Sequence, residues 1–247
     1  MKKKIPIIDI FAGPGGLGEG FSSVVDEKNN ERIFDIVLSI EKDPFAHKTL
    51  TLRSFLRQFP FNKLPAKYYS FLRNEITIEE LYNSHEKEYS IAKDEAFQYT
   101  LGTPEDPEYK TLDQRIRKAL NGTKDFVLIG GPPCQAYSLV GRARRQEKAG
   151  LRKEDERVFL YREYYRILAV HQPAVFIMEN VKGLLSSKID DQSIFSQLIN
   201  DLKSPVESYR KLHGSNRIPK SKFRYKIDRK STRLNSSHAN ISYAVFC

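Results

Sequence analysis

The side chain best suited to chemistry is Cys134, in the segment Gly130–Gln135 (Gly-Gly-Pro-Pro-Cys-Gln) at the end of a hydrophobic run. Two prolines restrict the backbone ahead of the thiol, and arginines are frequent in the segment that follows. Nearby positive charge lowers the pKa of a thiol toward neutrality, which makes the thiolate available as a nucleophile. A structural cysteine, the alternative, usually lies inside a strand. The pattern therefore favours a nucleophile at Cys134.

A second chemically active position is Glu179, which follows the hydrophobic run Ala174–Met178 and opens the sequence Glu-Asn-Val. The alternative is a glutamate that caps the following turn. In an open α/β sheet, ligands bind beyond the carboxyl ends of the strands. Because Glu179 and Cys134 each follow a strand-like run, we expect both in one cleft.

A glycine-rich segment, Gly13–Gly18, follows the apolar run Ile5–Phe11 and satisfies the pattern G-x-G-x-x-G. Glycines there let backbone amides approach a nucleotide-like ligand. Glu41 ends the next apolar run, Phe34–Ile40, where its carboxylate can accept hydrogen bonds from ribose hydroxyls. By itself the pattern fits a dinucleotide and S-adenosylmethionine equally, and a tight turn without a ligand is a further alternative.

Alternating strand-like and helix-like segments must position these residues. The expected strands are residues 5–11, 34–40, 126–129 and 174–178, and the expected helices follow the glycine turn, begin at Asp43-Pro44, and cover 158–170 and 190–202. Residues 63–122 are expected to form a helical insertion. This alternation predicts a doubly wound α/β fold with a parallel sheet.

The charge of the chain indicates an anionic partner. The 247 residues carry a formal net charge of +10, and ten basic residues against two acidic ones lie between Lys203 and Lys230. Such a surface suits phosphate backbones, although a merely solvated basic surface is an alternative. Two cysteines cannot build a disulfide framework, and no Cys/His spacing suggests a metal site. Without a membrane-length apolar stretch or a signal peptide, we expect a soluble intracellular protein.

Three motifs in this order resemble the first, fourth and sixth motifs of DNA (cytosine-5)-methyltransferases: Phe11–Gly16, Gly130–Ser138 and Glu179–Val181. The resemblance covers roughly residues 5–203. It implies the Rossmann-like fold of S-adenosylmethionine-dependent methyltransferases, a mostly parallel sheet with helices on both faces, incomplete here at the C-terminus.

The resemblance implies methylation of C5 of cytosine in double-stranded DNA, with S-adenosylmethionine as co-substrate and no metal. The Cys134 thiolate would add to C6 of a flipped cytosine, and Glu179 would hold and protonate N3. The implied cofactor-binding residues are Phe11, Ala12, Gly13, Pro14, Gly15, Gly16, Leu17, Glu41 and Pro133. The implied contacts to DNA are Gln135, Ser138, Arg142, Arg144, Arg145 and Asn180.

The sequence also departs from the family pattern. No Gly-Asp-Ile-type third motif precedes the cysteine, and the Gln-x-Arg-x-Arg motif, the target-recognition region and the returning C-terminal helix are missing. We therefore expect residues 1–203 to form the cofactor-binding and catalytic domain, residues 204–230 a basic segment leading to missing motifs, and residues 231–247 a non-native tail. A genuine terminal strand is the alternative for the tail. The chain alone is expected to be inactive.

The resulting hypothesis is a monomeric, cytoplasmic prokaryotic DNA cytosine-5 methyltransferase of restriction–modification type, with a companion endonuclease as a functional rather than physical partner. One alternative is a fragment that binds DNA or cofactor without turnover. Another is a nicotinamide-dependent dehydrogenase, which the glycine pattern alone supports and which leaves Cys134 and Glu179 unexplained.

Overall fold

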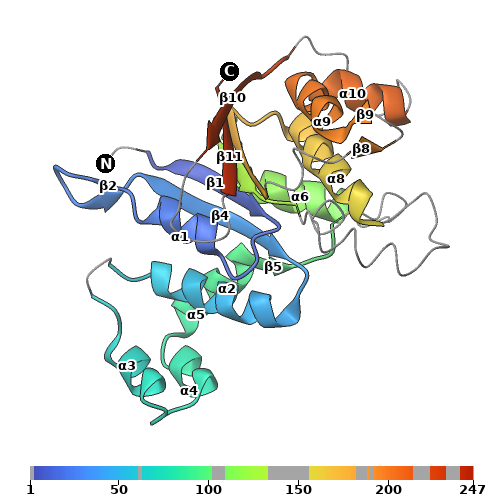
Figure 1. The fold of residues 1–247 in the computed structure, drawn as a ribbon. Coiled ribbons are helices and arrows are strands. Elements are labelled where there is room, and N and C mark those ends of the chain that lie inside the picture. The colour runs from blue at the N-terminus through green and yellow to red at the C-terminus, as the bar shows by residue number, and fades with distance from the viewer. Residues whose placement is uncertain are drawn as a thin grey trace. The chain divides into compact units, whose positions relative to one another are not determined.

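The computed structural model describes residues 3–60, 63–101, 109–132, 156–181, 188–189, 192–213, 223–231 and 240–246. Figure 1 labels the helices and strands of these residues. The chain divides into two compact units. The first contains residues 1–100 and 111–121, and the second contains residues 101–110 and 122–247.

The first unit is built on three parallel strands. Strand β4 pairs with β1 on one side and with β5 on the other, both in parallel. The elements of this unit are β1 (Ile5–Ile10), α1 (Gly16–Ser22), β2 (Val25–Asp26), β3 (Glu31–Arg32), β4 (Phe34–Glu41), α2 (Pro44–Arg57), α3 (Ala66–Leu72), α4 (Ile78–Asn83), α5 (Glu86–Glu95), β5 (Ala96–Gln98) and most of α6 (Tyr109–Leu120).

The core of this unit explains its hydrophobic runs. Residues that follow one another in β1, such as Ile7 and Ile8, are both fully buried, although they point to opposite faces of the sheet. In β4, Leu38 and Ile40 are buried as well. Consecutive burial means that both faces of the sheet are covered, as expected for parallel strands between helices. A second cluster around Phe55 joins α2, α4 and α5.

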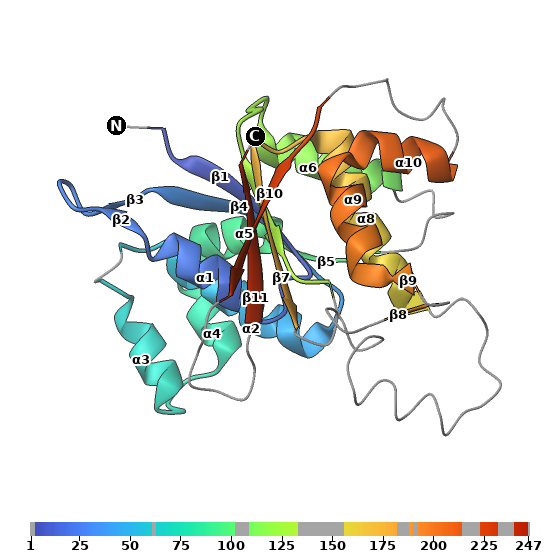
Figure 2. The same ribbon diagram turned by 45° about the horizontal axis from the view of Figure 1, so that its top comes forward.

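The second unit contains the strand that precedes Cys134. Strand β7 pairs in parallel with β6 and antiparallel with β11, and β11 pairs antiparallel with β10. Helices α8, α9 and α10 lie side by side in Figure 2. The elements are β6 (Val127–Gly130), α8 (Glu156–His171), β7 (Val175–Val181), β8 (Lys188–Ile189), β9 (Gln192–Ser193), α9 (Ile194–Lys203), α10 (Pro205–His213), β10 (Lys226–Ser231) and β11 (Asn240–Phe246).

The predicted α/β class with mostly parallel strands is confirmed, and each strand expected from the sequence is present. Several elements were not predicted: the strand pairs β2–β3 and β8–β9, strand β5 within the expected helical insertion, and helix α10 and strand β10, which both begin in the basic segment. Strand β11 lies within the expected tail, where a genuine terminal strand was the alternative. The domain limits at residues 203 and 230, and the non-native origin of residues 231–247, stay predictions. Among the described residues, no helix is long and apolar enough to cross a membrane.

Candidate cofactor and catalytic site

The glycine segment forms a tight turn at the carboxyl end of β1. The Ala12 N–H donates to the Ile40 carbonyl at 3.0 Å, so the chain leaves β1 alongside the end of β4. Gly13 and Gly15 have φ angles of +57° and +87°, in the left-handed region that favours glycine. Phe11 also has a positive φ, of 56°, which is costly for a residue with a side chain. Strain of this kind persists where surrounding structure enforces it, and it concentrates at functional sites.

Gly15 is also required by packing. A Cβ atom at Gly15 would lie 2.8 Å from Cδ1 of Leu50, a fully buried residue of α2. Gly13 differs, because a Cβ there would meet no atom within 4 Å. The turn is therefore closed against α2 at Gly15 and open beside Gly13.

Glu41 links this turn to the next loop. Its Oε2 accepts from the Gly13 N–H at 2.7 Å, and its Oε1 accepts from the Asp43 N–H at 2.7 Å. Asp43 in turn caps α2, since its Oδ1 accepts from the N–H groups of Phe45 and Ala46 at 3.0 and 2.8 Å. The cap predicted at Asp43-Pro44 is thus confirmed. A half-buried carboxylate stands beside the open side of the glycine turn, where the sequence analysis expected it.

This arrangement fits an adenosyl ligand. The space beside Gly13 admits a ligand close to the backbone, and the Glu41 oxygens are acceptors suited to vicinal hydroxyl groups. Both features lie at the carboxyl ends of adjacent parallel strands, the usual position of ligand sites in this architecture. Within the described part of the chain, no cluster of His, Cys, Asp and Glu could hold a metal ion.

Strand β5 ends beside Glu41. Gln98 is paired with Glu41 in the parallel register, its Nε2 donates to the Lys42 carbonyl at 3.3 Å, and the Tyr99 N–H donates to the Glu41 carbonyl at 3.0 Å. No Gly-Asp-Ile-type motif is recognisable in the sequence before the cysteine, and strand β5 was not predicted. Strand β5 ends at Gln98, which is followed by Tyr99 and Thr100, so no aspartate stands at its end.

In the second unit, the end of β6 lies against Glu179. A Cβ atom at Gly131 would lie 2.9 Å from the Glu179 carbonyl oxygen and 3.4 Å from its Cβ, and the adjacent Pro132 is buried. Gly130 is in register with Met178, the residue before Glu179. The segment leading to Cys134 therefore begins in contact with the residue that the sequence analysis paired with it.

Several predicted site residues lie outside the described residues: Pro133, Cys134, Gln135, Ser138, Arg142, Arg144 and Arg145. Asn180 lies in β7, where its backbone is described. Among the residues that the motifs singled out, Gly13 and Glu41 are in contact in the first unit. In the second unit, Gly131 lies against Glu179.

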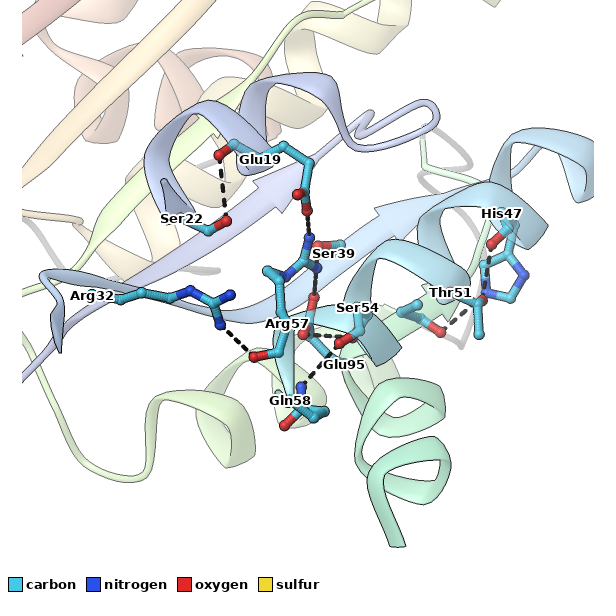
Figure 3. Close-up of polar contacts among 11 residues, drawn as sticks. Glu19, Ser22, Arg32, Ser39, His47, Thr51, Ser54, Arg57, Gln58 and Glu95 are labelled. Atoms are coloured by element: carbon cyan, nitrogen blue, oxygen red, sulfur yellow. Dashed lines mark hydrogen bonds and ion pairs between the residues drawn. The ribbon is translucent and has the colours of Figure 1, made fainter. Parts of the chain in front are cut away.

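A buried ionic cluster near the glycine turn was not predicted (Figure 3). The guanidinium of Arg57, at the end of α2, forms ion pairs with Glu19 of α1 and Glu95 of α5. The second carboxylate oxygen of Glu95 accepts from the Ser54 hydroxyl at 2.6 Å. Burial raises the pKa of Glu95, against the opposing effect of Arg57; the carboxylates raise the pKa of Arg57 despite its own burial.

Comparisons with known proteins were consistent with these motifs. A family model for C-5 cytosine-specific DNA methylases matches residues 75–209. The type II methyltransferase M.Bpa9945I of Bacillus paralicheniformis is 32% identical over 196 residues, 74% of this chain and 42% of that protein. The DNA (cytosine-5-)-methyltransferase M.ApeKI of Aeropyrum pernix is 43% identical over 68 residues, 28% of this chain and 14% of that protein. The solved structure of the rRNA methyltransferase aviRa from Streptomyces viridochromogenes has a TM-score of 0.40 and 13% identity, covering 99% of this chain and 77% of that chain.

The chain spans less than half the length of the curated relative M.Bpa9945I. The matched range 75–209 includes Cys134 and Glu179, whereas the glycine turn and Glu41 precede it. This range is more than half of the 247 residues. The chain therefore belongs to the C-5 cytosine-specific DNA methylase family.

Proposed function

We propose that this chain binds S-adenosylmethionine at the glycine turn and Glu41, and that it carries the nucleophile for methylation of C5 of cytosine in DNA. The observation that carries the proposal is the 2.7 Å hydrogen bond from the Gly13 N–H to Glu41, made at the carboxyl ends of two adjacent parallel strands. Family membership supplies the reaction class.

Each residue of the cofactor site has a distinct part in the proposal. Glu41 accepts hydrogen bonds from the ribose hydroxyls, and the open side of Gly13 admits the ligand close to the backbone. Gln98 and Tyr99, at the end of β5, border the site next to Glu41. When bound, S-adenosylmethionine supplies an electrophilic methyl group.

The remaining chemistry belongs to Cys134 and Glu179. Addition of the Cys134 thiolate to C6 saturates the neighbour of C5 and makes C5 nucleophilic. Glu179 holds N3 and gives it a proton, which removes the negative charge created by the addition. Once C5 has taken the methyl group, loss of the C5 proton to a base and expulsion of the Cys134 thiolate would restore the C5–C6 double bond. Return of the N3 proton to Glu179 would complete the aromatic ring of 5-methylcytosine. The contact between Gly131 and Glu179 supports this pairing, because it starts the cysteine-bearing segment beside the carboxylate.

The substrate in this proposal is double-stranded DNA. The target carbon lies inside the base stack, so the cytosine must be flipped out before Cys134 can reach it. Arg142, Arg144 and Arg145 would bind phosphates, with Gln135, Ser138 and Asn180 nearer the base. We further propose that the protein is a monomer in a prokaryotic cytoplasm. Its companion would be a restriction endonuclease that is a functional rather than a physical partner.

The test is transfer of tritium from labelled S-adenosylmethionine to DNA, followed by base analysis. The mechanism predicts label in 5-methylcytosine for a protein that completes this chain with the later motifs of the family, and none for the same protein carrying Cys134→Ala. Label transferred by Cys134→Ala at the wild-type rate would overturn the mechanism. Binding of S-adenosylmethionine by the 247-residue chain without any transfer would instead support the second candidate, a chain that binds without turnover.

A further inference from the structure

Helix α1, which carries the glycine turn, has little intrinsic stability. It spans seven residues, and three of them are glycines: Gly16, Gly18 and Gly20. Each glycine in a helix costs roughly 1 kcal/mol relative to alanine, and helices this short do not persist alone. Only Gly18 and Ser22 of this helix are buried, so side-chain packing anchors it weakly. At its C-terminal end, Phe21 makes an edge-on contact with Phe34.

Helix α1 is joined to α2 by the ion pair between Glu19 and Arg57 (Figure 3). The Arg57 side chain is 6% exposed, whereas that of Glu19 is 39% exposed. Arg57 is held independently by the buried Glu95, and the Arg57 carbonyl accepts from an Arg32 guanidinium N–H. The position of Arg57 therefore does not depend on Glu19, whereas the ion pair to Arg57 restrains the more exposed Glu19 side chain and the helix that carries it.

Helix α2 and its N-cap make two further contacts around the site, one to the glycine turn and one to Glu41. Leu50 fills the position that a Cβ would occupy at Gly15, and the Asp43 N–H ahead of α2 binds the Glu41 carboxylate. One helix thus holds Glu41 at its start, closes the turn in its middle, and binds α1 through Arg57 at its end.

We propose that the Glu19–Arg57 ion pair is a positioning contact that fixes the glycine turn relative to Glu41, and so sets the affinity for S-adenosylmethionine. The inference rests on the proposed function and deepens it. Neither residue is among those proposed to contact the ligand. Glu19 acts through α1, which begins at Gly16, three residues after the Gly13 N–H that donates to Glu41. The Glu19 N–H donates to the carbonyl of Gly15, which lies in the turn itself.

The experiment compares three variants of the 247-residue chain. Glu19→Ala removes the pair but keeps a good helix former, and Glu19→Gln keeps an oxygen that can accept from Arg57. Ser54→Ala is the matched control, since it removes the hydrogen bond to Glu95 at the other side of Arg57 and leaves Glu19 in place. Arg57 itself is left unchanged, because its loss would strand the buried Glu95 charge.

Three readouts separate positioning from stability: the Kd for S-adenosylmethionine, the urea midpoint, and hydrogen exchange of residues 12–23 without ligand. Glu19→Ala should weaken binding about tenfold, the equivalent of roughly one charged hydrogen bond, and speed exchange of residues 12–23. Glu19→Gln should restore most of the affinity. Ser54→Ala should lower the urea midpoint and leave Kd unchanged.

Two results would overturn the inference. One is an unchanged rate of hydrogen exchange for residues 12–23 in Glu19→Ala. The other is a Kd that rises in Ser54→Ala as much as in Glu19→Ala for the same drop in urea midpoint, because affinity would then depend on stability alone. If the wild-type chain does not bind S-adenosylmethionine, the proposed cofactor site fails. The exchange measurement still decides whether the ion pair orders the turn.

Discussion

Replacing Gly15 with alanine tests whether the turn is held as the structure has it. Two penalties apply at this position. A residue with a Cβ at φ +87° costs about 1–2 kcal/mol, and forcing an extra carbon to within 2.8 Å of Leu50 costs about 1–3 kcal/mol. Because Leu50 is fully buried, it has little room to move aside. The sum predicts a loss of about 2–5 kcal/mol in the free energy of unfolding.

Two other glycines provide matched controls for the same substitution. Gly13→Ala has the unfavourable φ of +57° but open space, so it should cost about 1–2 kcal/mol. Gly20→Ala lies in the exposed part of α1, with no atom within 4 Å of the new Cβ, and should stabilise by about 0.5–1 kcal/mol.

Urea unfolding followed by circular dichroism measures all three variants. The expected order of stability is Gly20→Ala, wild type, Gly13→Ala and then Gly15→Ala. A Gly15→Ala protein as stable as Gly20→Ala would refute both the left-handed conformation at Gly15 and its contact with Leu50.

Three further predictions concern the elements around the site. Asp43→Ala removes the α2 cap and should lower the free energy of unfolding by about 1 kcal/mol in urea titrations, with an unchanged value arguing against the cap. Phe55→Ala should cost about 3–5 kcal/mol, because it empties a fully buried position; a loss below 1 kcal/mol would contradict that burial. The pKa of Glu95 is raised in the folded state, so the folded protein binds a proton more readily than the unfolded chain. Acidification from neutral pH toward the ordinary glutamate pKa should therefore raise the free energy of unfolding of the wild type relative to that of Glu95→Gln. A wild-type free energy of unfolding that falls relative to the variant over this pH range would exclude the raised pKa.

The sequence was sufficient to predict the main strands and the start of α2. Strands β1 and β4 are buried on both faces, so their residues form continuous apolar runs that need no periodicity to be recognised. The start of α2 was predictable because Asp43 and Pro44 combine a capping side chain with a residue suited to the first helical turn. Glu41 was expected beside the glycine turn because both follow neighbouring strands.

The remaining features depend on long-range contacts. Strand β5 has three residues, too few for a hydrophobic period, and its identity comes from pairing with β4. Glu19 and Glu95 each lie 38 residues from Arg57, so no local pattern connects them. Helix α10 did carry a signal, since Val206 and Tyr209 are three residues apart and both buried, but the surrounding basic residues obscured it.

The central claim is that the glycine turn and Glu41 bind S-adenosylmethionine, and calorimetric titration of this chain tests it most directly. The account predicts saturable 1:1 binding, a loss of about tenfold or more for Glu41→Ala, as expected for charged hydrogen bonds, and no binding of NAD. The absence of binding, equal affinity in Glu41→Ala, or preferential binding of NAD would contradict it.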